Sequence, residues 1–343
     1  MERRARGLAI VVAGTIAISP DAALLRLMDA AGASVITITV WRNLVVALIN
    51  IIGVGVFSGG ARELVASIRI GSSVGPFIAG SLLLVLQNVG YVVSLLKVDA
   101  AKALLVISLN PLWAALLAYL VLGDAMATKT IVAQVCTGLS LLVIFAPTLF
   151  PTVISTAAGL PVDAAETSEL VDLVPLATGF AVAAFLCFSS YCSRIAVNDA
   201  ALDAAPAGGA VLTALLALAW AVHREAETGH NLYSHLFDVE PAFWLWLIID
   251  GVCTAAFNAA NVVAPRFISS TEVALVLLGE TLLGPLWVFA IFGVVPPAMT
   301  LAGGALLLAT LVGHEIVGMW DAKKETRADT KAEPLLPPAD SGC

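Results

Sequence analysis

The segment Gln87-Asn88-Val89-Gly90 lies in a stretch of sequence that returns, without a gap, around Phe257-Asn258-Ala259-Ala260, 170 residues further along the chain. The register extends from about 80 to 145 in the first copy and from about 250 to 315 in the second. The identical positions are Asn88 and Asn258, Leu105-Val106 and Leu275-Val276, Leu112 and Leu282, Leu116 and Leu286, Gly123 and Gly293, and Thr130 and Thr300. Exchanges among small apolar residues arise by chance, but a shared asparagine and a shared glycine in one register indicate a duplication. Repeats inside an apolar chain are typical of transporters built from two halves.

The composition indicates that the chain lies in lipid. Apolar residues make up 60% of it and charged residues only 12%, and the mean hydropathy is +0.98. A soluble domain carries about 25% charged residues. Most of the ionisable residues fall in short segments between apolar runs, as expected where a charge in hydrocarbon is costly.

Ten apolar runs have roughly the 20 residues that are needed to cross a hydrocarbon core about 30 Å thick. The predicted spans are 7–27, 33–57, 74–96, 99–122, 130–150, 174–196, 206–223, 241–264, 270–292 and 297–318. Backbone polar groups in lipid must bond within their own segment, so these spans are expected to be helices.

The distribution of Lys and Arg predicts the orientation of the spans. With the N-terminus in the cytoplasm, the cytoplasmic segments carry Arg3, Arg4, Arg6, Arg62, Arg69, Lys129, Arg194, Arg266, Lys323, Lys324, Arg327 and Lys331. The opposite segments carry Lys97, Arg224 and, by its place near a span end, Lys102. Both termini are therefore expected to be cytoplasmic.

Five spans in each copy is an odd number, so the second copy enters the membrane upside down relative to the first. The expected fold class is an all-α integral membrane protein with ten transmembrane helices in two inverted five-helix repeats. The expected domains are a first repeat at 1–150, an acidic extracytoplasmic loop at 151–173, a second repeat at 174–318 and a disordered cytoplasmic tail at 319–343. The protein is expected in the plasma membrane or an endomembrane.

Several short motifs occur in an order that is familiar from one transporter family. They are Trp41-Arg42, Leu109-Asn110-Pro111-Leu112-Trp113 with Leu122-Gly123-Asp124, Glu280-Thr281-Leu282-Leu283-Gly284-Pro285-Leu286-Trp287, and Ala302-Gly303-Gly304-Ala305. In these motifs the chain resembles the EamA-type permeases of the drug/metabolite transporter superfamily, from about 7 to 318. The resemblance implies inverted five-helix repeats and alternating-access transport of a small metabolite. The sequence departs from that family at Asp124, where Glu is usual, and at Val294, the equivalent position of the second copy. It also lacks the paired lysines of the sugar-phosphate and nucleotide-sugar branches. The identity of the substrate therefore stays open.

A polar stripe runs along the eighth predicted helix. Asp250, Thr254, Asn258 and Asn261 follow one another at spacings of four, four and three residues, which places them on one helix face. Such a stripe cannot face lipid at acceptable cost, so it is expected to face the interior of the bundle or a wet cavity. The alternative is that these side chains only join neighbouring helices by hydrogen bonds.

The other half of the chain carries matching polar residues. Asn88 and Tyr91 lie near one face of the third helix with Gln87 beside it, and Asn110 in the fourth helix corresponds to Glu280 in the ninth. We expect all of these residues and the stripe of the eighth helix to bind substrate. Pro111 and the Gly284-Pro285 pair interrupt the fourth and ninth helices, where freed backbone groups can contribute to a site or the kink can serve packing alone.

Arg42 and Glu280 are charged residues that the predicted spans place deep in the hydrocarbon. In one interpretation they pair, or exchange partners between conformations. In another, Arg42 binds an anionic group of the substrate while Glu280 takes up and releases a proton. A static structural ion pair is the remaining interpretation.

The sequence lacks a catalytic constellation, so we do not expect an enzyme. His223, His230, His235 and His314 lie in loops or near a membrane edge, away from Cys or carboxylate clusters at metal-binding spacing, so no metal or cofactor is expected. The expected function is a secondary transporter for a small polar metabolite, coupled to protons or operating as an exchanger; a receptor or scaffold without transport is the alternative. The expected partners are a small-molecule substrate and the lipid bilayer; nucleic acid is not expected, and a homodimer stays open.

Overall fold

The computed structural model describes residues 2–57, 74–97, 100–124, 128–149, 169–195, 199–228 and 236–293, together with 298–299, 301–307, 309–310, 312–314 and 316–317. Within these residues the chain is helical and has no strand. The predicted acidic loop up to residue 168 and the tail from residue 318 lie outside the described residues.

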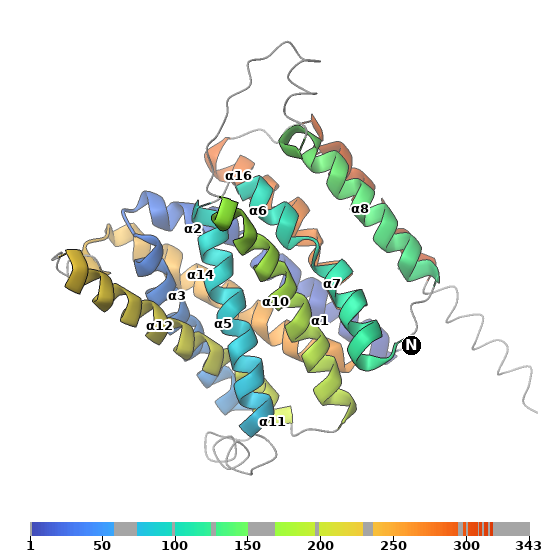
Figure 1. Ribbon diagram of the computed structural model, residues 1–343, viewed down its shortest axis with the longest axis horizontal. Helices are drawn as coiled ribbons and strands as arrows, with labels where there is room; N and C mark the ends of the chain where they lie inside the picture. Colours follow the sequence, from blue (N-terminus) through green and yellow to red (C-terminus); the bar gives the residue numbers. More distant parts are fainter. Residues whose placement is uncertain are drawn as a thin grey trace, which may run out of the picture.

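The long helices pack into one bundle, in which most of them run side by side in the view of Figure 1. The helices of the first half are α1 (Glu2–Ile18), α2 (Asp21–Ala30), α3 (Val35–Phe57), α5 (Val74–Lys97), α6 (Ala100–Ile107), α7 (Asn110–Leu117), the π-helix η1 (Ala118–Leu122) and α8 (Thr128–Leu149). Those of the second half are α10 (Glu169–Arg194), α11 (Asp199–Asp203), α12 (Ala205–Thr228), α14 (Pro241–Val263), the 3-10 helix η2 (Ala264–Arg266), α15 (Ser270–Leu277) and α16 (Gly279–Phe292).

Seven helical segments are long and apolar enough to cross a membrane, by length and composition, within the described residues. They are Glu2–Ala30, Val35–Val56, Val74–Lys97, Leu173–Arg194, Ala201–Glu225, Pro241–Arg266 and Ser270–Phe292. Each coincides with one of the spans predicted from hydropathy. Shorter apolar helices occur at Asn110–Leu122, Thr128–Val143 and Leu301–His314, where the other three spans were expected.

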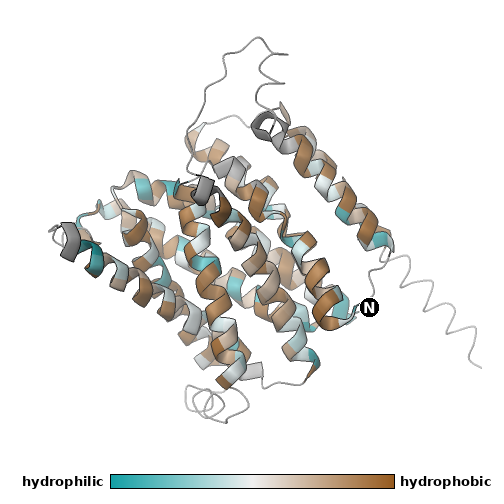
Figure 2. Ribbon diagram, viewed as in Figure 1, coloured by the Kyte–Doolittle hydropathy of each residue, from teal (hydrophilic) through white to brown (hydrophobic). Residues whose placement is uncertain are grey.

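The surface of the bundle is apolar where a water-soluble protein would be charged. Large apolar side chains stand exposed on its flanks, among them Leu48, Ile52, Leu82, Leu215 and Leu245. Figure 2 shows hydrophobic residues along the lengths of the helices. These features are those of an all-α, multi-pass membrane protein.

The sixth span was predicted from residue 174. The helix α10 begins at Glu169, and its candidate membrane span begins at Leu173.

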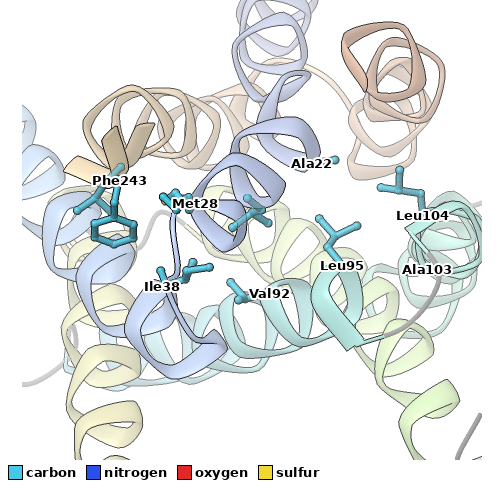
Figure 3. Packing of buried hydrophobic residues seen from close by; sticks show 12 residues of the cluster. Ala22, Met28, Ile38, Val92, Leu95, Ala103, Leu104 and Phe243 are labelled. Atoms are coloured by element: carbon cyan, nitrogen blue, oxygen red, sulfur yellow. The ribbon is translucent and has the colours of Figure 1, made fainter. Parts of the chain in front are cut away.

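Two large apolar clusters lie at different levels of the bundle. The Phe243 cluster, shown in Figure 3, contains Ala22, Leu25, Met28, Ala31, Ala33, Ile38, Val92, Leu95, Ala103, Leu104, Phe243 and Leu247. The Phe257 cluster contains Val11, Ile18, Ala114, Val182, Ala183, Leu186, Phe257, Ala264, Ile268, Val273, Ala274 and Leu277. The first therefore occupies the N-terminal part of α14 and the second its C-terminal part.

The helix α8 lies along one side of the bundle, next to the C-terminal helical segment (Figure 1). Ala133 of α8 and Leu307 of that segment pack with Leu275 and Leu278 in a small apolar cluster.

Candidate functional site

A buried charge cluster lies between α2, α3 and α14. The guanidinium of Arg42 donates from Nη2 to Asp21 Oδ1 at 2.6 Å and from Nε to Asp250 Oδ2 at 2.7 Å. Nη2 also donates to the hydroxyl of Thr254 at 2.9 Å. Asp21 and Asp250 are fully buried, and Arg42 is 3% exposed. Removing Arg42 from this cluster would leave two buried carboxyl groups without their cation.

The contacts of Trp41, the residue before Arg42, orient α3 so that the side chain of Arg42 faces inward. The indole of Trp41 donates to the carbonyl oxygen of Leu236 at 2.9 Å, and its ring packs edge-on against Trp244 with the ring centroids 5.1 Å apart. These contacts fix the rotation of α3 against α14. Arg42, the next residue along the helix, then points toward Asp250.

Asp21 is a site residue that sequence reasoning did not single out. It is the first residue of α2, after a break in which Pro20 has no N–H for the carbonyl oxygen of Ile16. The hydroxyl of Ser19 donates a hydrogen bond to that carbonyl oxygen, with an oxygen–oxygen distance of 2.8 Å. A carboxylate inside the first apolar run, directly after a proline, was the signal in the sequence that could have identified it.

Glu280 has a partner other than Arg42. The hydroxyl of Tyr91 donates a hydrogen bond to Glu280 Oε1, joining α5 to α16. The guanidinium carbon of Arg42 lies 5.8 Å from the centroid of the Tyr91 ring, in cation–π range. The direct Arg42–Glu280 pair that the sequence suggested is therefore not formed here, because Arg42 binds Asp21 and Asp250 instead.

A small cavity of about 30 Å³ lies beside this cluster, large enough for about one or two water molecules. Its polar lining comprises Arg42, Gln87, Asn88, Tyr91, Asn110, Thr254, Asn258 and Glu280. Its apolar lining comprises Ile18, Ile107, Val182, Phe257 and Leu277. Side chains from both halves of the chain thus meet around one space.

Two residues of the predicted site stand outside this lining. Asp250 touches Arg42 but is not in the cavity wall. Asn261 is also absent from the wall, although it is 1% exposed and its amide atoms have no partner among the described residues. The expectation that Asn261 shares a chamber with Asn88, Tyr91 and Asn258 is not met in this conformation, because Asn261 lies one turn further along α14 than Asn258.

The amides in the cavity wall have unused hydrogen-bonding capacity. Gln87 Oε1, Asn88 Nδ2, Asn110 Oδ1 and both amide atoms of Asn258 are buried without a hydrogen-bond partner in the part of the chain that the structure describes. A buried polar atom left unsatisfied costs about 1–3 kcal/mol. A polar molecule that offers both donors and acceptors would stabilise this wall.

Two helix breaks flank the cavity. Ser108 and Leu109 separate α6 from α7, and Leu278 separates α15 from α16. The hydroxyls of Ser108 and Thr281 are hydrogen-bonded to each other, so the broken helices meet at their interruptions. The break near Pro111 was expected, whereas the one in the ninth span lies at Leu278 rather than at Gly284-Pro285.

Each break places one polar side chain in the cavity wall. Asn110 opens α7 and Glu280 is the second residue of α16. Both broken helices end at a glycine in the left-handed conformation, with φ of 70° at Gly123 and 69° at Gly293. These two glycines are equivalent positions in the sequence repeat.

Comparison with known proteins finds a solved structure with the same fold. No family description and no curated protein matches this chain. A solved crystal structure superposes with a TM-score of 0.63 at 17% identity, over 91% of this chain and 98% of its own. At this identity the likeness establishes a shared fold alone.

Proposed function

We propose that this protein is a secondary transporter that moves a small polar metabolite across a membrane by alternating access, as an EamA-type permease of the drug/metabolite transporter superfamily. The observation that carries the proposal is the cavity between two helix breaks. It is lined by amides from both halves of the chain that have atoms without a hydrogen-bond partner among the described residues. Discontinuous helices around a central polar site are a recurring feature of transporters. Transport is coupled to protons or proceeds by exchange.

The packing of the helices supports a repeat. The helix α5 packs against α10, and α14 packs against α1. With the offset of the sequence repeat, α5 corresponds to α14 and α10 to α1, so the two pairs are equivalent. The broken helix formed by α6 and α7 corresponds to the one formed by α15 and α16. The two pack together through α7 and α15, as elements next to a pseudo-two-fold axis would.

The three shorter apolar helices bring the proposed number of transmembrane helices to ten. With five spans in each half, the halves have opposite orientations and both termini are cytoplasmic. Three ion pairs fit this topology, because Arg4 binds Glu272, Arg194 binds Asp124 and Arg266 binds Asp203 at positions assigned to the cytoplasmic end.

Alternating access requires the cavity to open toward one side at a time. Along α14, the cavity residues Thr254 and Asn258 follow the Phe243 cluster and overlap the start of the Phe257 cluster. Both clusters include side chains from the two halves of the chain. Separation of the halves at one cluster, while the other stays packed, would open the cavity to one side of the membrane.

The proposal is tested first by ligand-dependent stability. We would measure the melting temperature of the purified protein with panels of amino acids, nucleosides, sugars and small amines. A ligand at 100 times its Kd stabilises a folded protein by about 2.7 kcal/mol. The ligand that stabilises it should then exchange across the membrane of proteoliposomes that contain the protein.

A matched pair of variants assigns any transport to the cavity. Asn258→Ala removes an amide from the cavity wall and should abolish both ligand stabilisation and exchange. Asn43→Ala removes a buried amide that donates to the carbonyl oxygen of Thr39 in its own helix, at 2.8 Å, and should preserve both. Ligand stabilisation without exchange would instead indicate a receptor or scaffold.

A further inference from the structure

In each of the carboxyl groups of Asp21 and Asp250, only one of the two oxygens accepts a hydrogen bond from a described residue. Asp21 Oδ1 and Asp250 Oδ2 accept from Arg42. Asp21 Oδ2 and Asp250 Oδ1 are buried and have no hydrogen-bond donor among the described residues. Buried carboxylate oxygens normally have such a donor.

The charges of this cluster do not balance either. Two carboxylates and one guanidinium leave one negative charge, and all three groups lie in candidate membrane spans. Among the described residues, the other titratable groups near the cluster are Tyr91 from α5, Glu280 from α16 and Cys253 from α14. None of these three supplies a positive charge. An uncompensated charge in such a place is costly.

One bound proton would supply the missing hydrogen-bond donor and would also balance the negative charge of the cluster. Asp21 and Asp250 bind neighbouring nitrogens of one guanidinium, Nη2 and Nε, so their carboxyl groups lie side by side. If one of them is a carboxylic acid, its O–H becomes the missing donor, its partner's oxygen becomes the acceptor, and the cluster becomes neutral. We propose that Asp21 and Asp250 share one bound proton at neutral pH and form a proton-binding site distinct from Glu280.

The bound proton joins the two halves of the chain. Asp21 lies on α2 in the first half, and Asp250 lies on α14 in the second. Release breaks the O–H bond, transfers the proton to water and leaves two carboxylates beside one guanidinium. Their repulsion would weaken the contact between α2 and α14. The coupling of proton release to transport rests on the proposed transport function. The presence of the bound proton does not, because it can be measured without transport.

Infrared spectroscopy detects the proton directly. A protonated carboxylic acid has a carbonyl stretching band that a carboxylate lacks. We would record this band for the purified full-length protein at neutral pH, with and without ¹³C-labelled aspartate. The label should shift an aspartic acid band and leave any band from Glu280 in place.

Isosteric variants assign the band. In either Asp21→Asn or Asp250→Asn, the remaining carboxylate balances Arg42, so the variant should fold and the label-sensitive band should disappear. Asp29→Asn, at an exposed position of the same helix as Asp21, should retain the band. Absence of a label-sensitive band in the wild type, or its survival in either cluster variant, would overturn the proposal. So would failure of both cluster variants to fold, because each preserves a neutral cluster.

Discussion

The hydroxyl of Tyr91 and the carboxyl group of Glu280 form a hydrogen bond that joins α5 to α16, across 189 residues of sequence. Both side chains line the cavity, and the Tyr91 ring also lies beside Arg42. Tyr91 therefore connects the buried charge cluster to the carboxyl group at the start of α16. A change at Glu280 can be separated from a change in the cluster, because the two share Tyr91 but no direct ion pair.

Glu280→Gln should fold like the wild type and lose transport. The glutamine carbonyl oxygen can still accept from Tyr91, whereas the ionisable group in the cavity wall is gone. We expect exchange of the identified ligand to fall at least about tenfold, which corresponds to about 1.4 kcal/mol. Initial rates in proteoliposomes and the melting temperature in detergent test this. Glu240→Gln, at an exposed position before α14, is the control, and wild-type exchange by Glu280→Gln would contradict the prediction.

Arg42→Gln should destabilise the fold by about 3–5 kcal/mol, because it leaves buried carboxylates without their cation. A second change, Asp250→Asn, should recover part of that loss by removing one of them. A second change at Glu280 should not, since Arg42 binds Asp21 and Asp250 instead. Melting temperatures of the single and double variants measure the couplings. Rescue by Glu280→Gln would show that Arg42 and Glu280 depend on each other directly.

Gly179→Ala should destabilise the packing of α10 beside the first helix break. A Cβ atom at this position would lie 2.9 Å from the carbonyl oxygen of Ile107 and 3.2 Å from its Cα, and backbone cannot rotate away. Such overpacking costs about 1–3 kcal/mol. Gly138→Ala in α8 meets no atom within 4 Å and should stabilise its helix by about 0.5–1 kcal/mol. Equal melting temperatures for the two variants would refute this reading of the contact.

The proposed topology predicts opposite labelling of two introduced cysteines. In a background without native cysteines, Glu166→Cys should react with an impermeant thiol reagent from outside sealed cells. Thr326→Cys should react only after the membrane is permeabilised. The reason is the excess of Lys and Arg in segments assigned to the cytoplasm. Labelling of position 326 in sealed cells would place the C-terminus outside.

Local properties of the sequence were enough to predict much of the fold. Runs of apolar residues as long as a bilayer is thick must form helices, because lipid offers no partner to the backbone. The end of α16 at Gly293 follows from a glycine that readily adopts the left-handed conformation. The face shared by Thr254 and Asn258 follows from helical periodicity, and both residues line the cavity. Their role in binding substrate stays a prediction.

The pairing of charges could not be predicted in this way. Arg42 binds Asp21, which is 21 residues away in the sequence, and Asp250, which is 208 residues away. Hydropathy and periodicity place each residue on a helix face, but they do not specify which faces meet. That choice depends on close packing between helices, such as the contact of α14 with α3 at Gly251, where a Cβ atom would lie 2.4 Å from Val45. The sequence alone therefore determined the apolar helices and their polar faces, and only the tertiary structure decided that Arg42 is shared by two carboxyl groups while Glu280 binds Tyr91.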